Sequence, residues 1–164
     1  DFAGIKIRTM NNKNHMAFWT ALGANPSPMA FSEVYTSLQT GAIDAQENPY
    51  EVIVGNKFYE VQKYVIQTNH LPHILVLMTG NSLYSSLNDE EKKVMDQAAT
   101  EAKAYARQMA DSRVDDRIAK IKAGGAEIVE VSAELYSQMK TAAQSVYSSI
   151  KSQVGDDLFN AYIK

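Results

Sequence analysis

Hydrophobic and polar residues in the first third of the chain show a strand-like period of two in some segments and helical spacing in the segments between them. Period-two alternation and short extended runs predict three strands, at residues 4–10, 24–30 and 42–46. Apolar residues at spacings of three and four predict two helices between them, at residues 11–22 and 32–40, each followed by a glycine. Because strands and helices alternate with short connections, we predict an α/β fold with right-handed βαβ units and a parallel sheet.

The middle of the chain indicates less regular structure. Residues 50–64 have helical spacing that weakens at Gly55 and Asn56, so we expect one interrupted helix or two short ones. Residues 64–79 form two apolar extended pieces on either side of residues 69–72. At that break we expect a hinge or a crossover between sheets.

A capping box formed by Asn88 and Glu91 begins a long helix. Apolar residues keep helical spacing from Asp89 to about Ala123 without interruption, and two glycines end the helix. At 1.5 Å per residue the helix would be roughly 50 Å long, whereas a compact domain of this size has a radius of gyration of about 15 Å. We therefore expect this helix to bridge two bodies.

The end of the chain predicts one more strand and two helices. Residues 126–131 alternate as a strand does, and Ser132 caps a helix with an apolar stripe. After Gly155, a last short helix offers four apolar residues for packing: Leu158, Phe159, Tyr162 and Ile163.

Composition narrows the classes of function. The chain has 164 residues, of which 45% are hydrophobic and 21% are charged, as expected for an ordinary globular domain. Its net charge of −3 and lack of a basic stripe argue against a nucleic-acid partner. The absence of cysteine excludes disulfides, thiolate nucleophiles and Cys-ligated metals. No run approaches 18 apolar residues and no signal-peptide pattern is present, so we expect neither a membrane span nor a leader in this sequence.

Three side chains suit the recognition of an organic anion. Arg8, Phe31 and Asn48 each lie at or just past the carboxyl end of a predicted strand, and such ends share one edge of a parallel sheet. A guanidinium meets a carboxylate with two charge-assisted hydrogen bonds, and an aromatic face and an amide complete a site for a planar anion. The alternative is a structural role for each: a surface ion pair for Arg8, core packing for Phe31 and a turn for Asn48.

Few residues indicate catalysis or a metal centre. His70 and His73 stand on either side of Pro72, but no carboxylate has a recognisable ligand spacing, so we expect no metal. Asp44 and Glu47 are three apart on a predicted strand and should face opposite ways, which disfavours a paired acid and base. No phosphate loop or nucleophile motif is present. We therefore expect a protein that is not an enzyme and needs no cofactor.

Several motifs occur in a fixed order along essentially the whole chain. They are GIKIR at 4–8, LGANPSPMAFSEVY at 22–35, LQTG at 38–41, DAQENP at 44–49, KFYEVQK at 57–63 and TNH at 68–70. Together they resemble the solute-binding receptors of tripartite ATP-independent periplasmic (TRAP) transporters, in their dicarboxylate-receptor family. Two positions depart from the family pattern, since Ala45 stands where Gly is usual and Ser37 where Ala is common.

The resemblance implies a periplasmic-binding-protein-like second lobe with a parallel βαβ sheet, a long bridging helix and C-terminal helices. It divides the chain into a ligand-binding core at 1–69, a crossover strand and loop of the first lobe at 70–88, the bridging helix at 89–123, and a strand with helices at 124–164 that packs back on the second lobe. Family members are about twice this length, so the resemblance implies a whole first lobe and a signal peptide outside this sequence.

The resemblance also implies a site and a function. The arginine that clamps the ligand carboxylate is Arg8, the ring that packs on the ligand is Phe31, and the amide that hydrogen-bonds it is Asn48; Asn11 and His70 match less regular pocket positions. The implied function is that of a periplasmic receptor that captures an organic acid, such as a C4 dicarboxylate or a sugar acid. The receptor would deliver the acid to the membrane subunits of a TRAP transporter.

A lobe without its partner has physical consequences. We expect weak binding of carboxylates, because water competes for hydrogen bonds in a half-open site. We also expect exposed apolar surface around residues 74–78 and on the long helix, and oligomer contacts through it. Two other hypotheses stay open: a non-catalytic interaction module that docks through the long helix, and an acidic hydrolase that uses Asp44 or Glu47.

Overall fold

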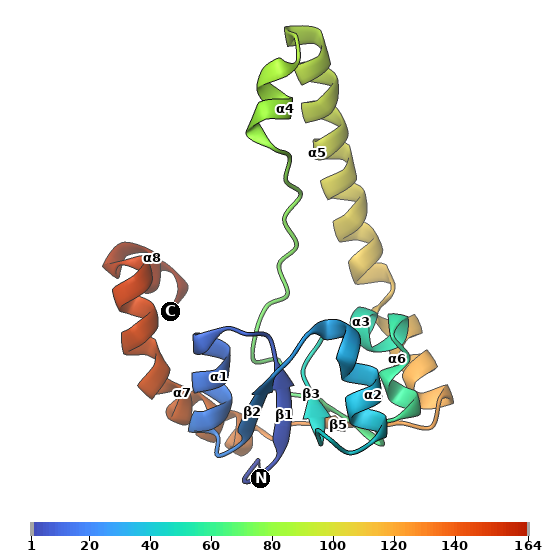
Figure 1. Ribbon diagram of the computed structural model, residues 1–164, viewed down its shortest axis with the longest axis vertical. Coiled ribbons are helices and arrows are strands. Elements are labelled where there is room, and N and C mark those ends of the chain that lie inside the picture. Colours follow the sequence, from blue (N-terminus) through green and yellow to red (C-terminus); the bar gives the residue numbers. More distant parts are fainter. Residues whose placement is uncertain (1, 164) are drawn as a thin grey trace.

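The computed structural model describes residues 2–163 and shows an α/β body from which one long arm projects (Figure 1). The arm consists of residues 71–112, and the other described residues form the body. The predicted α/β fold is confirmed, since the strand pairings of the described residues are parallel.

The described residues form five strands in two small sheets. In the first sheet β1 (Lys6–Thr9) lies between β2 (Asn25–Pro28) and β3 (Ala45–Gln46). In the second, β4 (Tyr64–Gln67) pairs with β5 (Glu127–Glu130). The sequence therefore predicts the strands correctly, although β3 is shorter than residues 42–46 and residues 74–79 join no strand ladder among the described residues.

Short helical elements connect these strands as predicted. They are α1 (Lys13–Ala21), a 3₁₀ turn (Phe31–Glu33), α2 (Val34–Gln39), α3 (Tyr50–Gly55) and a second 3₁₀ turn (Phe58–Glu60). The interruption predicted at Gly55 and Asn56 is confirmed, because α3 ends there. Gly23 and Gly41 follow their helices with φ of +88° and +73°, a region that glycine adopts without strain.

Two apolar clusters stabilise the body. The larger one joins α2, α3 and the helix before β5 around the buried side chains of Phe58 and Ile121. The smaller one lies at α1, where Trp19 packs with Ile7 and Ala24. The larger cluster contacts β4 and β5 through Val65 and Ile128, and the smaller one includes Ile7 of β1.

The prediction of an uninterrupted helix over 89–123 is wrong, because the helix breaks at Arg113. That residue, with φ −96° and ψ −6°, ends α5 (Asp89–Ser112) and begins α6 (Val114–Ala123). Asp115 and Asp116 form a new acidic first turn, which favours a helix N-terminus there. The burial of Ile121 fixes α6 on the body, whereas the 24 residues of α5 extend roughly 36 Å away from it.

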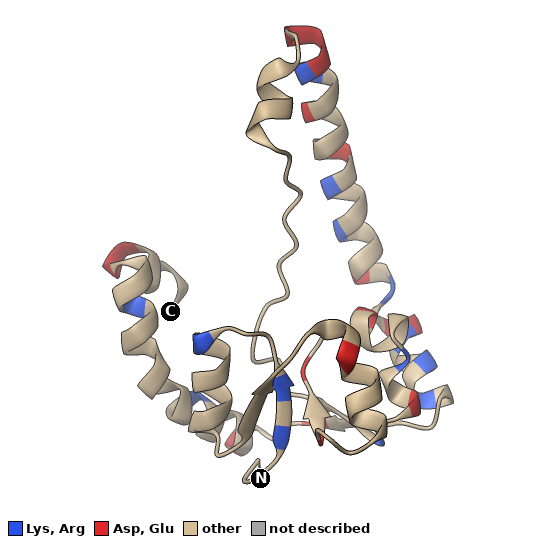
Figure 2. Ribbon diagram, in the orientation of Figure 1, with Lys and Arg blue, Asp and Glu red and all other residues tan. Residues whose placement is uncertain are grey.

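The arm consists of apolar chain with little covering. Its connecting segment, residues 71–80, has no regular structure and carries no charged residue (Figure 2). Ile74 is 66% exposed and Leu75 is 85% exposed, which confirms the expected apolar surface. At the tip, α4 (Asn81–Ser86) lies beside α5, and the predicted capping box of Asn88 and Glu91 is present.

The C-terminal helices lie at the other side of the body. The helix capped by Ser132, α7 (Ala133–Val154), packs on α1, and the side-chain amides of Asn14 and Gln153 hydrogen-bond each other across that contact. The expected packing of α8 (Asp156–Tyr162) is wrong for most of its apolar residues, because Leu158 is 52% exposed and Tyr162 73% exposed. The two helices join at Gly155, where the chain reverses, so that α8 turns back beside the end of α7 and Phe159 meets Tyr147 (Figure 1).

No helix among residues 2–163 combines the length and the apolar character needed to cross a membrane.

An ion pair that joins α6 to α3 should make the free energy of unfolding of the body depend on pH. Arg117 donates from Nε to Glu51 at 2.6 Å and from Nη2 at 3.0 Å. The hydrogen bond from Arg117 lowers the pKa of Glu51 from its ordinary value of 4.5, so the stabilisation is present above that pH and is lost as the pH falls through the lower native pKa. Urea unfolding between pH 7 and pH 3 should therefore show a smaller acid loss for Glu51→Gln than for the unaltered chain.

The matched control for this ion pair is Glu130→Gln, at an exposed position of β5. Its unfolding curves should follow those of the unaltered chain at every pH. Identical pH dependence of Glu51→Gln and the unaltered chain would show that the pair contributes nothing.

A buried hydroxyl in β1 should cost stability. Thr9 is fully buried, and its Oγ1 has no hydrogen-bond partner among the described residues. Replacing the hydroxyl with a methyl group in Thr9→Val should raise the free energy of unfolding by about 1 kcal/mol, because an unsatisfied polar group is removed. Thr9→Ser, which keeps the hydroxyl and loses the methyl, should be less stable than the unaltered chain in the same urea titration. A loss of stability in Thr9→Val would mean that the hydroxyl has a partner.

Candidate functional site

The candidate site lies at the carboxyl ends of the three strands of the first sheet. Arg8 lies in β1, Phe31 follows β2, and Asn48 follows β3. In Figure 1 this edge of the body faces the side from which the arm departs. The three residues that the sequence singles out are therefore brought to one edge, as predicted.

The guanidinium of Arg8 is buried and held from two directions. Its Nε and Nη2 donate to the main-chain oxygen of Met29 at 3.3 and 3.0 Å. The ring of Phe31 covers it, with 5.5 Å between the ring centroid and Cζ. Of five N–H donors, two are used, so the Nη1 end of the fork keeps its donors for another partner. This geometry prepares the fork for a bidentate contact with a carboxylate.

A neighbouring charge and burial shift the pKa of Arg8 in opposite directions. Burial lowers its pKa, and the carboxylate of Glu47 raises it. A guanidinium nevertheless stays protonated at any physiological pH. The site therefore holds a permanent cation with only 5% of the residue exposed, and such a cation favours an anionic partner.

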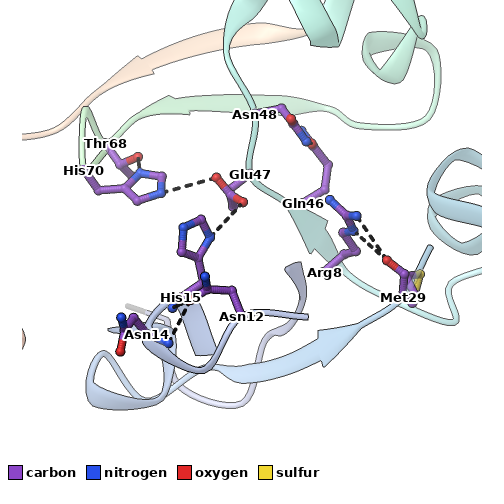
Figure 3. Close-up of polar contacts among 10 residues, drawn as sticks. All are labelled: Arg8, Asn12, Asn14, His15, Met29, Gln46, Glu47, Asn48, Thr68 and His70. Carbon is purple, nitrogen blue, oxygen red and sulfur yellow. Dashed lines mark hydrogen bonds and ion pairs between the residues drawn. The ribbon is translucent and has the colours of Figure 1, made fainter. Parts of the chain in front are cut away.

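An amide pair stands next to Arg8 on the neighbouring strand. Gln46 is the residue of β3 that pairs with Arg8 across the ladder. The Nδ2 of Asn48 donates to Oε1 of Gln46 at 2.7 Å. Figure 3 shows the guanidinium pointing toward this pair. Because residues two apart on a strand share a face, Gln46 and Asn48 line the same side as Arg8.

The residue between these two amides faces the other way and joins two histidines. Glu47 has Oε1 3.8 Å from Nδ1 of His15 and Oε2 3.5 Å from Nε2 of His70 (Figure 3). The His70 ring is held further by Thr68, whose Oγ1 lies 2.7 Å from Nδ1, and by stacking on Phe18. The carboxylate thus ties α1 to the loop after β4 beside the site.

Two hollows adjoin this cluster. One, of about 140 Å³, lies between β3 and β4 and is mostly apolar. The other, of about 230 Å³, opens beside the loop after β4. Both are lined by Glu47, Asn48 and His70. Neither Arg8 nor Phe31 lines either hollow, so the hollows lie on the histidine side of β3 and not at the guanidinium.

The structure places some of the remaining predicted residues at the site and others away from it. His70 lies in the cluster, whereas Asn11 is exposed ahead of α1, whose cap is the neighbouring Asn12. Asp44 accepts from the main-chain N–H of Lys6 at 2.9 Å and shares no partner with Glu47 among the described residues. No group of three potential ligands among residues 2–163 is arranged to hold a metal ion.

Sequence reasoning missed four contributors to the site. Gln46 could have been found, because it shares the strand face of Asn48 at a spacing of two. Glu47, which follows β3, meets His15 of α1 and His70 of the loop after β4 only in the folded chain. The carbonyl of Met29 is a main-chain group and leaves no signal in the sequence.

Comparison with known proteins identifies one family. The family described as bacterial extracellular solute-binding protein, family 7, matches residues 1–153. A solute-binding protein of Roseobacter denitrificans is 37% identical over 155 residues, which are 94% of this chain and 47% of the relative. The chain thus spans about half the length of the curated relatives that it matches.

Solved TRAP periplasmic solute-binding proteins share the fold. One from Shewanella oneidensis, with bound succinate, is 32% identical at a TM-score of 0.88, and the match covers 98% of this chain and 53% of that protein. One from Polaromonas sp. JS666, bound to D-erythronate, is 34% identical at a TM-score of 0.91, with 98% and 52% covered. These likenesses confirm the resemblance and the fold class that the sequence indicates.

Proposed function

Because the chain belongs to the bacterial extracellular solute-binding proteins of family 7, we propose that it forms one lobe of a receptor that captures an organic acid. The observation that carries this proposal is the orientation of Arg8. The buried guanidinium donates to a main-chain carbonyl on one side and lies against an aromatic ring with one face. Its remaining N–H groups can still donate to a carboxylate. The acids bound by the two solved relatives, succinate and D-erythronate, are carboxylates.

The roles of the site residues follow from this arrangement. Arg8 clamps the carboxylate, Phe31 packs on the ligand as well as on Arg8, and Asn48 hydrogen-bonds the ligand. His70 belongs to the pocket because its ring pairs with Glu47, on the side of β3 opposite the amide pair. Asn11 contributes to the pocket only at its rim, since it is exposed.

The division of the chain is part of the proposal. Residues 1–69 are the ligand-binding core of the second lobe, and residues 70–88 belong to the first lobe. Residues 89–123 bridge the lobes with a bend at Arg113, and residues 124–164 return to the second lobe. The exposure of the arm supports this division, because an uncovered apolar segment and helix suit an interface with a first lobe. Residues 1 and 164 lie outside the described residues.

The cellular role is proposed from the family. The receptor works in the periplasm, carries out no chemical reaction on the acid, and delivers it to the membrane subunits of a TRAP transporter. The family is one of solute-binding proteins, and the carboxylates of Asp44 and Glu47 have separate partners, which disfavours an acidic hydrolase.

A second candidate function is a non-catalytic interaction module that docks through α5. The exposure of Val94 and Tyr105, at 69% and 62%, favours it. Its distinguishing feature would be an Arg8 engaged in an ion pair. Arg8 instead donates to a main-chain carbonyl, so the receptor is the better supported function.

Binding by the 164-residue chain should be weak and should depend on Arg8. One lobe leaves most of a ligand in water, so we expect a Kd of about 1 mM or weaker for succinate and D-erythronate in an NMR titration. Arg8→Gln should weaken binding by about tenfold or more, because charge-assisted hydrogen bonds are lost. Lys122→Gln, which removes an exposed cation from α6, should leave binding unchanged. Nanomolar binding, or an unaffected Arg8→Gln variant, would contradict the proposal.

The uncovered arm should also cause the chain to associate. Light scattering at rising protein concentration should show reversible oligomers, because residues 74–78 expose a continuous apolar surface. Leu77→Lys should reduce association. Tyr162→Lys, at a position 73% exposed against 74% for Leu77, is the matched control and should leave association unchanged. A strictly monomeric chain at high concentration would contradict this expectation.

A further inference from the structure

We propose that residues 74–78 of a second copy of this chain add as a β-strand between β3 and β4. Two unpaired strand edges and one uncovered apolar segment support this pairing. The pairing goes beyond the proposed receptor function, which concerns one chain and its ligand.

The strands β3 and β4 are each the last strand at one side of a sheet. Among the pairings of residues 2–163, β3 pairs only with β1, and β4 pairs only with β5. The hollow of about 140 Å³ lies between these two free edges. A free strand edge presents N–H and C=O groups with which another extended chain can pair.

The register of β4 shows which of its N–H groups are free. The main-chain oxygen of Lys63 accepts from the N–H of Glu127 at 2.9 Å, and the ladder continues in this register. Because alternate residues of a strand direct their main-chain groups to opposite sides, the N–H groups of Tyr64 and Ile66 point away from β5 and toward the hollow. Neither of these two N–H groups has a hydrogen-bond partner in the described part of the chain.

The hollow offers apolar walls from both clusters of the body. Ile53 and Phe58 of the larger cluster line it, and so do Ile7 and Trp19 of the smaller cluster. A strand that enters between β3 and β4 would therefore bury its side chains against apolar groups of both clusters, which stabilises an apolar strand at this place.

Residues 74–78 have the sequence of a central strand and are uncovered. They read Ile-Leu-Val-Leu-Met, a continuous apolar run that is typical of a strand covered on both faces. Their side chains are between 66% and 85% exposed, and their main-chain groups form no hydrogen bond with any described residue. Because the segment carries no charge, adding it to the hollow would bury no ion.

The arm keeps this segment away from the hollow of its own chain. The next element, α4, lies beside α5, and Tyr84 of α4 donates to the carboxylate of Asp96 of α5 at 3.0 Å (Figure 1). If residues 74–78 turned back onto their own β4, residues 79–88 would have to span the roughly 36 Å of α5. Ten extended residues reach at most about 33–36 Å, so α4 would have to unfold. A second copy can supply the segment with its α4 intact.

Each copy carries one such hollow and one such segment. Reciprocal exchange between two copies would pair the free edges of β3 and β4 in both and would bury both segments, so we expect a closed dimer. In that dimer the two sheets of each body become one sheet, in which the added strand lies between β3 and β4.

Amide hydrogen exchange tests the pairing on the 164-residue chain without any substitution. As the protein concentration rises and the dimer forms, exchange at the N–H groups of Tyr64 and Ile66 should slow by about tenfold or more, because both gain a hydrogen-bond partner. The N–H groups of Val65 and Gln67 face β5 and are the internal controls. Their exchange by local opening should change by less than about twofold.

A mixture of isotope-labelled and unlabelled chains locates the added strand. Nuclear Overhauser effects selected for pairs of different copies should join residues 74–78 of one copy to Tyr64 and Ile66 of the other. Effects confined to a single copy would show that the segment folds onto its own strand edge, and they would overturn the choice of a second copy.

A proline substitution separates strand pairing from unspecific apolar contact. Val76, which is 68% exposed, can be replaced without disturbing the body. Val76→Pro keeps the segment apolar but removes an N–H and does not fit a central strand, so it should weaken the dimer by about tenfold or more in light scattering. Asn81→Pro is the matched control and should leave the dimer unchanged, because the first position of a helix accepts proline and Gly80 before it is already extended.

Two further results would overturn the pairing. Exchange at Tyr64 and Ile66 that does not change with protein concentration would show that the edge of β4 stays free. A Val76→Pro chain that associates as tightly as the unaltered chain would show that the association is unspecific. Either result would leave the receptor function standing, because binding of an acid at Arg8 is measured separately.

Discussion

The site depends on how a buried guanidinium is satisfied. A cation taken out of water needs partners, and Arg8 finds a carbonyl on one side and an aromatic face above. Neither partner neutralises its charge, so the fork keeps its affinity for an anion. The strands place this cation at the edge where β1, β2 and β3 end, one residue beyond Ile7 of the smaller apolar cluster.

The end of β3 and the loop after it carry three consecutive residues that belong to two different environments. Gln46 and Asn48 face Arg8, whereas Glu47 faces the two histidines. Successive side chains of an extended chain point to opposite faces, so Glu47 lies on the other face from Gln46 and Asn48. The outer face fixes the position of α1 and of the loop after β4, and the inner face stays available for a ligand. Packing and recognition are thus divided between neighbouring side chains and do not compete for the same groups.

Much of this arrangement could be predicted from local patterns. The strands, the helix caps and the edge shared by Arg8, Phe31 and Asn48 follow from periodicity and the geometry of parallel sheets. The bend at Arg113 could not, because an apolar stripe continues through it and only the docking of α6 on the body decides the direction. The cluster around Glu47 could not either, because its histidines come from distant parts of the chain.

Among residues 2–163, the chain connects the body and the arm at two places, the segment that leaves after β4 and the bend at Arg113. Any rigid partner seated on the arm would therefore be attached through two pivots. An attachment at two points allows the partner to rotate about the line between them. It restricts translation of the partner and rotation about other axes. Because the edge that carries Arg8 faces the arm, that single rotation would also carry a partner on the arm toward or away from the guanidinium.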